Sequence, residues 1–365
     1  MRLVSSVVVL AAMIANAEAA LTPVTDFGSN PGALDMLEYV PAGMPSGRPL
    51  VVVLHGCTQQ AASMEPAGWN ALADKYQFAV VYAQQRNANQ MLSCFTWYDV
   101  GDIARGAGEA QSIVQMVDKE VAMHGIDAGR VYVTGISAGG AFTAVMLAAY
   151  PDRFRAGSIM AGLPYKCATD ISTASTCSSN PRPPQEWGDL VRGAMPGFTG
   201  TYPRVQIWHG SKDFTVPTAN AGELVKQWTN VHGIDQTADV EDTISTATRT
   251  QYKSGDKVVV ELYMVNGMGH AIATGEDAMG ACPATSGAFF SDQKICSTLR
   301  AAQFFGLLGS GSGSDGSGSG SDGDGDGDGS GNSGGGGGCA AGGNAGLAAL
   351  AAVALIALWR RRRSR

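Results

Sequence analysis

The sequence is poor in the residue clusters from which several kinds of functional site are built. It has only five histidines, and its seven cysteines do not form the closely spaced sets that a structural zinc site needs. Basic residues are scattered, apart from a cluster at the C-terminus, and the formal net charge is -7 at pH 7. Nucleic-acid binding usually requires a positively charged patch, so we expect no nucleic-acid partner.

The N-terminal apolar run is too short to span a bilayer. It extends from Leu3 to Ile14 behind the basic Arg2, and small residues follow up to Ala17 and Ala19. This three-part order is typical of a secretory signal peptide, so residues 1–19 are predicted to be removed on export, with cleavage after one of these two alanines. A retained membrane anchor is the alternative.

The C-terminal region begins with a long stretch that lacks the apolar residues needed for a core, and only its last segment is apolar. Residues 309–338 are almost wholly Gly, Ser and Asp, which predicts a flexible linker. An apolar run from Ala340 to Trp359 follows Cys339, ends at a cluster of arginines and is long enough to cross a bilayer. Residues 339–365 resemble bacterial C-terminal sorting signals of the MYXO-CTERM or GlyGly-CTERM kind. The resemblance implies processing by a sorting protease, and a plain membrane anchor is the alternative.

Residues 20–308 are predicted to form one large domain. Segments with helical spacing, at Gly108 to His124, Ala138 to Tyr150 and Gly222 to His232, lie between short apolar runs. Six of these runs are rich in β-branched residues and predict buried parallel strands: Leu50 to Leu54, Phe78 to Tyr82, Val131 to Thr134, Gly157 to Ala161, Val205 to Trp208 and Val258 to Met264. The alternation predicts an α/β fold, a mostly parallel sheet with helices on both faces and a ligand site at the carboxyl ends of the strands.

A candidate nucleophile lies between a predicted strand and a predicted helix. The strand leads directly into Gly135-Ile136-Ser137-Ala138-Gly139, with which the helix begins. Small residues on both sides allow a serine to occupy a strained turn with its hydroxyl exposed, which is the context of a nucleophile elbow. We predict Ser137 as the nucleophile, and an ordinary Gly-rich turn is the alternative.

A serine nucleophile needs a base and a carboxylate that orients the base. Four histidines stand before glycines at the ends of strands or helices, where packing or capping explains them: His55, His124, His209 and His232. His270 lies instead in a loop after the last core strand, and we predict it as the base. The carboxylate is expected between the serine and the histidine in the sequence, and Asp213 fits, in the loop after the strand that ends at Trp208.

Acyl transfer also requires donors for the oxyanion that forms on the substrate. The backbone N–H of Ala138, directly after the nucleophile, is the first predicted donor. The second should come from the loop after the strand Leu50 to Leu54, where Cys57 is the candidate.

The cysteines suggest an oxidising compartment, because seven occur in a chain with an export signal. Closeness in the sequence suggests three disulfides, Cys57–Cys94, Cys167–Cys177 and Cys282–Cys296. Cys339 in the tail would remain unpaired.

Several segments resemble a known esterase family. Those similar to polyhydroxybutyrate depolymerases of carbohydrate esterase family 1 are Leu54 to Gln59, Cys94 to Trp97, Gly135 to Gly140 and Ala161 to Tyr165. Those similar to the acetylxylan and feruloyl esterases of that family are Val24 to Pro31, Glu186 to Leu190, Gly269 to Ala271 and Gly275 to Asp277. The resemblance extends over roughly residues 22–308 and implies an α/β-hydrolase fold, no metal or organic cofactor, and the catalytic and oxyanion roles given above.

The family resemblance implies a secreted carboxylesterase acting on acyl or feruloyl esters of plant polysaccharide. A polyhydroxybutyrate depolymerase or oligomer hydrolase is the nearest alternative, and an acyltransferase or a non-catalytic surface binding protein are alternatives of another class. The segment Pro164 to Pro203 is expected to wall the pocket, with Trp187 and Thr58 in contact with the ester substrate. Because the catalytic domain is followed by a Gly/Ser/Asp linker and no further folded module, we expect soluble sugar esters to be hydrolysed faster than solid polyester.

Overall fold

The computed structural model describes residues 21–174, 176–282 and 288–309. The predicted signal peptide, the linker after Gly309, Cys339 and the C-terminal apolar segment therefore lie outside the described residues. Within the described ranges, no helix is both long and apolar enough to cross a membrane.

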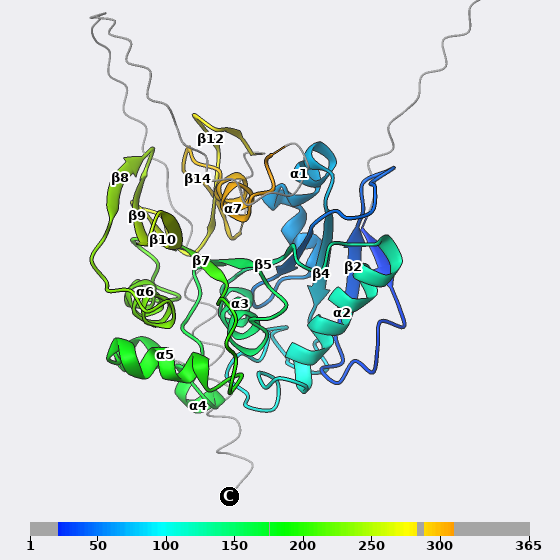
Figure 1. The fold of residues 1–365 in the computed structure, drawn as a ribbon, viewed down its shortest axis with the longest axis horizontal. Helices are drawn as coiled ribbons and strands as arrows, with labels where there is room; N and C mark the ends of the chain where they lie inside the picture. Colours follow the sequence, from blue (N-terminus) through cyan, green and yellow to red (C-terminus); the bar gives the residue numbers. More distant parts are fainter. Residues whose placement is uncertain (1–20, 175, 283–287, 310–365) are drawn as a thin grey trace, which may run out of the picture.

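A ten-stranded sheet forms the centre of the molecule (Figure 1). In spatial order its strands are β1 (Thr22–Val24), β2 (Asp35–Tyr39), β4 (Ala79–Gln84), β3 (Leu50–Leu54), β5 (Val131–Ile136), β6 (Ala156–Met160), β7 (Arg204–Gly210), β10 (Lys257–Val265), β9 (Ala247–Ser254) and β8 (Val240–Ile244). The six strands from β4 to β10 in this order pair in parallel. They are the six strands that the apolar runs predict, so the mostly parallel sheet is confirmed.

Antiparallel strands extend this parallel block on both sides. β1 and β2 lie beside β4, and β9 and β8 lie beside β10. The apolar pattern misses all four, because β1 is only three residues long, β2 and β9 mix buried with half-buried or exposed positions, and β8 has no buried position.

Helices cover both faces of the sheet, as predicted (Figure 1). On one face lie α2 (Gly108–His124), α3 (Ala138–Ala149) and α6 (Ala219–Val231), and α5 (Pro184–Arg192) packs against α6. On the other face lie α1 (Trp69–Tyr76) and α7 (Ser297–Phe305). The remaining elements of the described chain are η1 (Ala61–Ala67), α4 (Ile171–Ala174), η2 (Cys177–Ser179), and two small paired sheets, β11 (Ile272–Thr274) with β14 (Phe290–Asp292) and β12 (Glu276–Asp277) with β13 (Gly280–Ala281).

The core lies on both faces of the sheet, and β3 shows why its strands are apolar throughout. Every residue of β3 is buried. Leu50, Val52 and Leu54 belong to the apolar cluster under α2, α3 and α6, whereas Val51 and Val53 belong to the cluster under α1 and α7. Since successive side chains point to opposite faces, a strand covered on both faces needs a continuous apolar run.

Phe305, on α7, is predicted to be a major stabilising residue of the second cluster. Its ring is 2% exposed and stacks on Tyr132 and Trp69, with centroids 4.8 and 6.1 Å apart. We expect Phe305→Ala to lower the free energy of unfolding by about 3–5 kcal/mol in urea titrations, because a buried aromatic ring leaves a cavity. The exposed Met123 provides the control, since Met123→Ala should change stability by less than about 0.5 kcal/mol. Equal effects would contradict this role.

Candidate active site

Ser137 occupies the single residue between β5 and α3. Its backbone has φ 59° and ψ −121°, a combination that residues with a side chain rarely adopt. The residue is half-buried at the carboxyl edge of the parallel strands. The local geometry is therefore that of the strained turn predicted for a nucleophile elbow.

Close approach of three backbone segments enforces this turn. A Cβ atom on Gly139 would lie 2.3 Å from the carbonyl oxygen of Leu54, and one on Gly135 would lie 2.5 Å from the carbonyl oxygen of Gly139. No side chain fits at either position, so α3 can begin directly against β3 and β5 only because both residues are glycine. The two glycines thus explain why the serine lies where it does.

Asp213 and His270 form a direct hydrogen bond. The Nδ1 atom of His270 lies 2.7 Å from Oδ2 of Asp213. The other carboxylate oxygen, Oδ1, accepts hydrogen bonds from the backbone N–H groups of Thr215 and Val216, both at 2.9 Å. Asp213 is 3% exposed, so its carboxylate is held in one orientation with one oxygen directed at the imidazole.

Two loops that follow neighbouring parallel strands hold this pair together. The Ser211 N–H donates to the carbonyl oxygen of Val265, and the Lys212 N–H donates to that of Met268, each at 2.9 Å. A Cβ on Gly210 would lie 2.3 Å from the Met268 carbonyl oxygen, so the loops are in direct backbone contact. The position of Asp213 after β7 and of His270 after β10 is therefore fixed by the sheet.

The Asp213–His270 pair shares the carboxyl edge of the sheet with Ser137. Ile136, Met268 and Ala271, which flank the serine and the histidine, belong to one apolar cluster. Within the described chain, no hydrogen bond joins Ser137 Oγ to His270 Nε2. In enzymes without substrate such bonds are often long and tighten only in the complex.

His209 also lies near Asp213 but is engaged elsewhere. Its Nε2 atom is 2.8 Å from the carbonyl oxygen of Val216 and 3.6 Å from Oδ2 of Asp213. Burial lowers the pKa of this fully buried imidazole, which keeps it neutral. The packing role predicted for His209 agrees with this environment.

The loop His55-Gly56-Cys57 lies directly beside Ser137. A Cβ on Gly56 would be 3.3 Å from the Cβ of Ser137. Among the described residues, neither the Cys57 nor the Ala138 backbone N–H donates to another group. Both N–H groups are thus uncommitted within the described chain, and their role as oxyanion donors stays a prediction.

A buried histidine supports this loop. His55 Nδ1 lies 2.7 Å from the Gly56 carbonyl oxygen, and Nε2 accepts the backbone N–H of Gln85 at 3.1 Å. Burial lowers the pKa of His55 to about 4, so the ring stays neutral near pH 7 and can keep one donor and one acceptor. The packing role predicted for His55 therefore includes holding the Gly56–Cys57 peptide.

Comparison with known proteins relates this architecture to a family. The family model described as esterase PHB depolymerase matches residues 34–251. The chain belongs to this family. One relative is poly(3-hydroxyalkanoate) depolymerase C of Paucimonas lemoignei, which is 50% identical over 297 residues that cover 80% of this chain and 71% of that protein.

Other members and a solved structure agree with the family assignment. Feruloyl esterase B of Neurospora crassa is 38% identical over 271 residues, covering 72% of this chain and 91% of that protein. The structure of an acetyl xylan esterase from Aspergillus awamori matches with a TM-score of 0.68 at 26% identity, covering 80% of this chain and 100% of that one. The α/β-hydrolase fold and the prediction of a carboxylic ester hydrolase are confirmed.

The three disulfides in the described part of this esterase pair as predicted. Cys57 is joined to Cys94, Cys167 to Cys177, and Cys282 to Cys296. The first of them ties the loop beside Ser137 to the segment from Cys94 to Trp97.

Behind this disulfide lies a buried polar network that no sequence pattern predicts. Gln85 Nε2 donates to the Cys94 carbonyl oxygen at 3.1 Å and also to Oε1 of Glu109. The Thr96 hydroxyl and backbone N–H donate to the same carboxyl group at 2.7 and 2.9 Å. Burial raises the pKa of Glu109 to about 8. No local pattern marks Gln85 or Glu109, since only the fold brings them together.

Two residues are predicted to contact the substrate, and the prediction for Trp187 is wrong. Its side chain is fully buried, and its indole N–H donates to Oε2 of Glu223 at 2.6 Å, so it fixes α5 against α6 and is closed to a substrate. Thr58 remains a prediction. It is exposed next to Cys57, and its hydroxyl donates to the Cys57 carbonyl oxygen at 2.6 Å.

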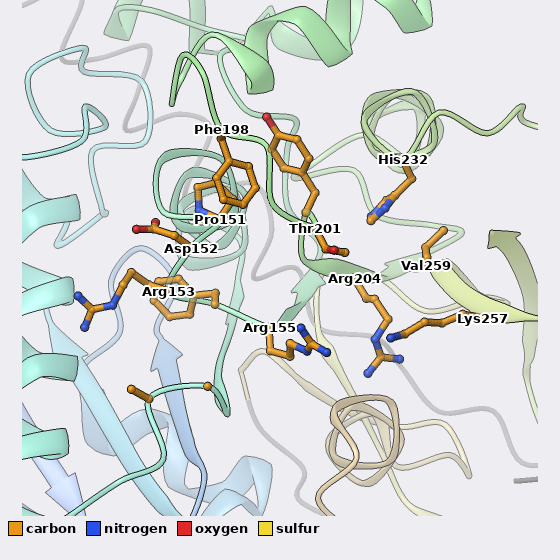
Figure 2. Close-up of a pocket in the computed structure, with 14 residues that line it drawn as sticks. Pro151, Asp152, Arg153, Arg155, Phe198, Thr201, Arg204, His232, Lys257 and Val259 are labelled. Atoms are coloured by element: carbon orange, nitrogen blue, oxygen red, sulfur yellow. The ribbon is translucent and has the colours of Figure 1, made fainter. Parts of the chain in front are cut away.

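A separate cavity of about 280 Å³ lies at the opposite edge of the sheet (Figure 2). Its lining includes Arg155, just before β6, Arg204 at the start of β7, and Lys257 at the start of β10. These are the amino ends of the parallel strands, whereas Ser137 and His270 follow carboxyl ends. This basic cavity is therefore distinct from the candidate active site.

Because Asp213 is hydrogen-bonded to His270, we predict that removing only the charge of Asp213 has a large effect on catalysis. We expect Asp213→Asn to lower kcat/KM for a soluble ester by on the order of 10³–10⁴-fold, because the amide favours the wrong tautomer of the imidazole. The side chain keeps its size, so the melting temperature should change little. A fall of less than about tenfold, measured on p-nitrophenyl butyrate, would show that another group orients His270.

Proposed function

We propose that this family member is a serine esterase in which Ser137, His270 and Asp213 act as nucleophile, base and orienting carboxylate. The observation that carries the proposal is the 2.7 Å bond from His270 Nδ1 to a buried Asp213, on the same sheet edge as the strained Ser137. With Nδ1–H committed to Asp213, Nε2 is left as the basic nitrogen of the neutral ring.

The reaction proceeds in two acyl transfers. His270 Nε2 takes the proton of Ser137 Oγ as this oxygen attacks the ester carbonyl carbon, and the N–H groups of Cys57 and Ala138 bind the negative oxygen that results. The alcohol leaves with the proton from His270, which creates an acyl ester on Ser137. Water, deprotonated by His270, then releases the acid and restores the serine.

The protein is proposed to act outside the cytoplasm. Three disulfides within the described domain suit an oxidising compartment. The N-terminal pattern supports export, and the C-terminal pattern supports surface attachment or membrane anchoring, by processing or by a retained helix.

The first proposed substrate class is a poly(3-hydroxyalkanoate), which reverses the ranking drawn from the sequence. The depolymerase of Paucimonas lemoignei shares 50% identity with this chain. The structure also exposes apolar side chains on loops after the carboxyl ends of β4 and β7, with Met91 at 65%, Val100 at 57% and Phe214 at 82%. Phe214 directly follows Asp213. An apolar surface around the site would allow adsorption to a solid polyester without a separate module.

The second candidate substrate class is an acyl or feruloyl ester of plant polysaccharide. It is supported by the 38% identity to a feruloyl esterase and by the match to the acetyl xylan esterase structure. Acid release from polyhydroxybutyrate film and from acetylated xylan, at equal enzyme concentration, discriminates the two, because faster release from xylan would restore the polysaccharide ester to first place.

The proposed nucleophile is tested directly by Ser137→Ala. Without the hydroxyl no acyl-enzyme forms, so kcat for p-nitrophenyl butyrate should fall by on the order of 10⁵-fold or more. Thermal unfolding of the variant provides the control for folding. If the folded variant keeps substantial turnover, the mechanism is wrong.

The proposed adsorption surface is tested by paired methionine variants. Met91→Ser should slow acid release from polyhydroxybutyrate film by roughly threefold or more, because apolar contact with the solid is lost. Its kcat/KM for soluble p-nitrophenyl butyrate should stay unchanged. The matched control is Met123→Ser. Met123 is also exposed, but it lies next to the last residue of α2, at the opposite end of that helix from the loop that contains Met91. If both variants hydrolyse film at the parent rate, Met91 has no part in adsorption.

A further inference from the structure

Three side chains with metal-binding atoms meet between α2 and β2, away from the Ser137 edge. Glu38 lies on β2, and Glu120 and His124 lie on the last turns of α2. His124 Nε2 is 2.9 Å from Oε2 of Glu38 and 3.9 Å from Oε2 of Glu120. One ligand atom from each residue lies within 4.8 Å of the other two. One ion could therefore contact all three.

Glu120 is the unusual member of this cluster. Its side chain is fully buried, and neither carboxylate oxygen has a hydrogen-bond partner. Among the described residues, no Lys or Arg forms an ion pair with Glu38 or Glu120. Since an unpaired buried carboxylate is costly, this geometry calls for a cation or a proton.

We propose that Glu38, Glu120 and His124 bind one zinc ion. Imidazole and carboxylate donors suit zinc, whereas calcium and magnesium prefer sets of oxygen ligands. Residues 120 and 124 are four apart and therefore share one face of the helix. The side chains of Glu38 and His124 are 12% and 24% exposed, which leaves one side of the ion open to water as a further ligand.

The proposed ion is structural and has no part in ester hydrolysis. Glu38 belongs to an edge region of the sheet that the parallel block does not include, and His124 is the last residue of α2. A zinc ion between them would join the end of the helix to this antiparallel extension. This differs from the expectation of no metal, which rested on the lack of closely spaced zinc-ligand sets in the sequence and on the family resemblance.

The experiment is zinc titration of the full chain by calorimetry at pH 7.5, after treatment with EDTA and dialysis. We expect one equivalent of zinc to bind, with magnesium and calcium at least tenfold weaker. Glu120→Gln and His124→Asn should each lower the zinc affinity by tenfold or more, because each removes a direct ligand. The control is His270→Asn, which should bind zinc as the parent does and so excludes the Asp213–His270–His209 group.

Thermal unfolding gives a second readout that does not depend on the ester site. At a free zinc concentration of 100 Kd, the melting temperature of the parent should rise by about 5 °C, and that of His124→Asn should not change. His124 is partly exposed, so this variant remains informative if Glu120→Gln fails to fold. The proposal is overturned if the parent binds no zinc, or if both ligand variants bind it with parental affinity. The first result would indicate that a proton neutralises the two glutamates.

Discussion

The geometry of the candidate active site, at the carboxyl edge of the sheet, depends on the close crossing of backbone segments around Ser137. The first turn of α3 contacts the end of β3 so closely that Gly139 and Gly135 leave no space for a Cβ. This contact forces the serine backbone to positive φ, which costs on the order of 1–3 kcal/mol and must be balanced by packing elsewhere. α3 is buried along its entire length, and this burial provides the compensation.

The same crossing also sets the position of the loop His55-Gly56-Cys57. The residues after β3 pass beside the serine, and their peptide groups are fixed from the far side by His55, by the disulfide to Cys94 and by the network around Glu109. Preorganised donors are effective because they need no rearrangement when charge develops on the substrate. In the proposed mechanism, the disulfide and the buried polar groups would keep the N–H groups of Cys57 and Ala138 in place beside the hydroxyl of Ser137.

The sequence predicts what is decided locally and misses what tertiary contacts decide. The six parallel strands are recognisable because burial on both faces demands continuous apolar runs, and Ser137 is recognisable because its turn demands small neighbours. The edge strands lack such runs. The environments of the buried Glu109 and Glu120 are formed by residues distant in the sequence, such as Gln85 and Glu38, so no local pattern predicts them. Trp187 shows the converse error, since an aromatic residue in a segment expected to wall the pocket is instead a core residue of α5.

The two edges of the sheet differ in a way that bears on attachment. The carboxyl edge has the serine and the exposed apolar loops, whereas the amino edge has the basic cavity (Figure 2). α7 ends at the amino edge, because Arg204 at the start of β7 donates to the Phe304 carbonyl oxygen and Phe305 stacks on Tyr132 near the start of β5. The described chain stops only a few residues later, at Gly309. If the following segment attaches the protein to a surface, the attachment begins at the amino edge, and the predicted flexible linker leaves the carboxyl edge with Ser137 free to meet a polymer or an oligomer.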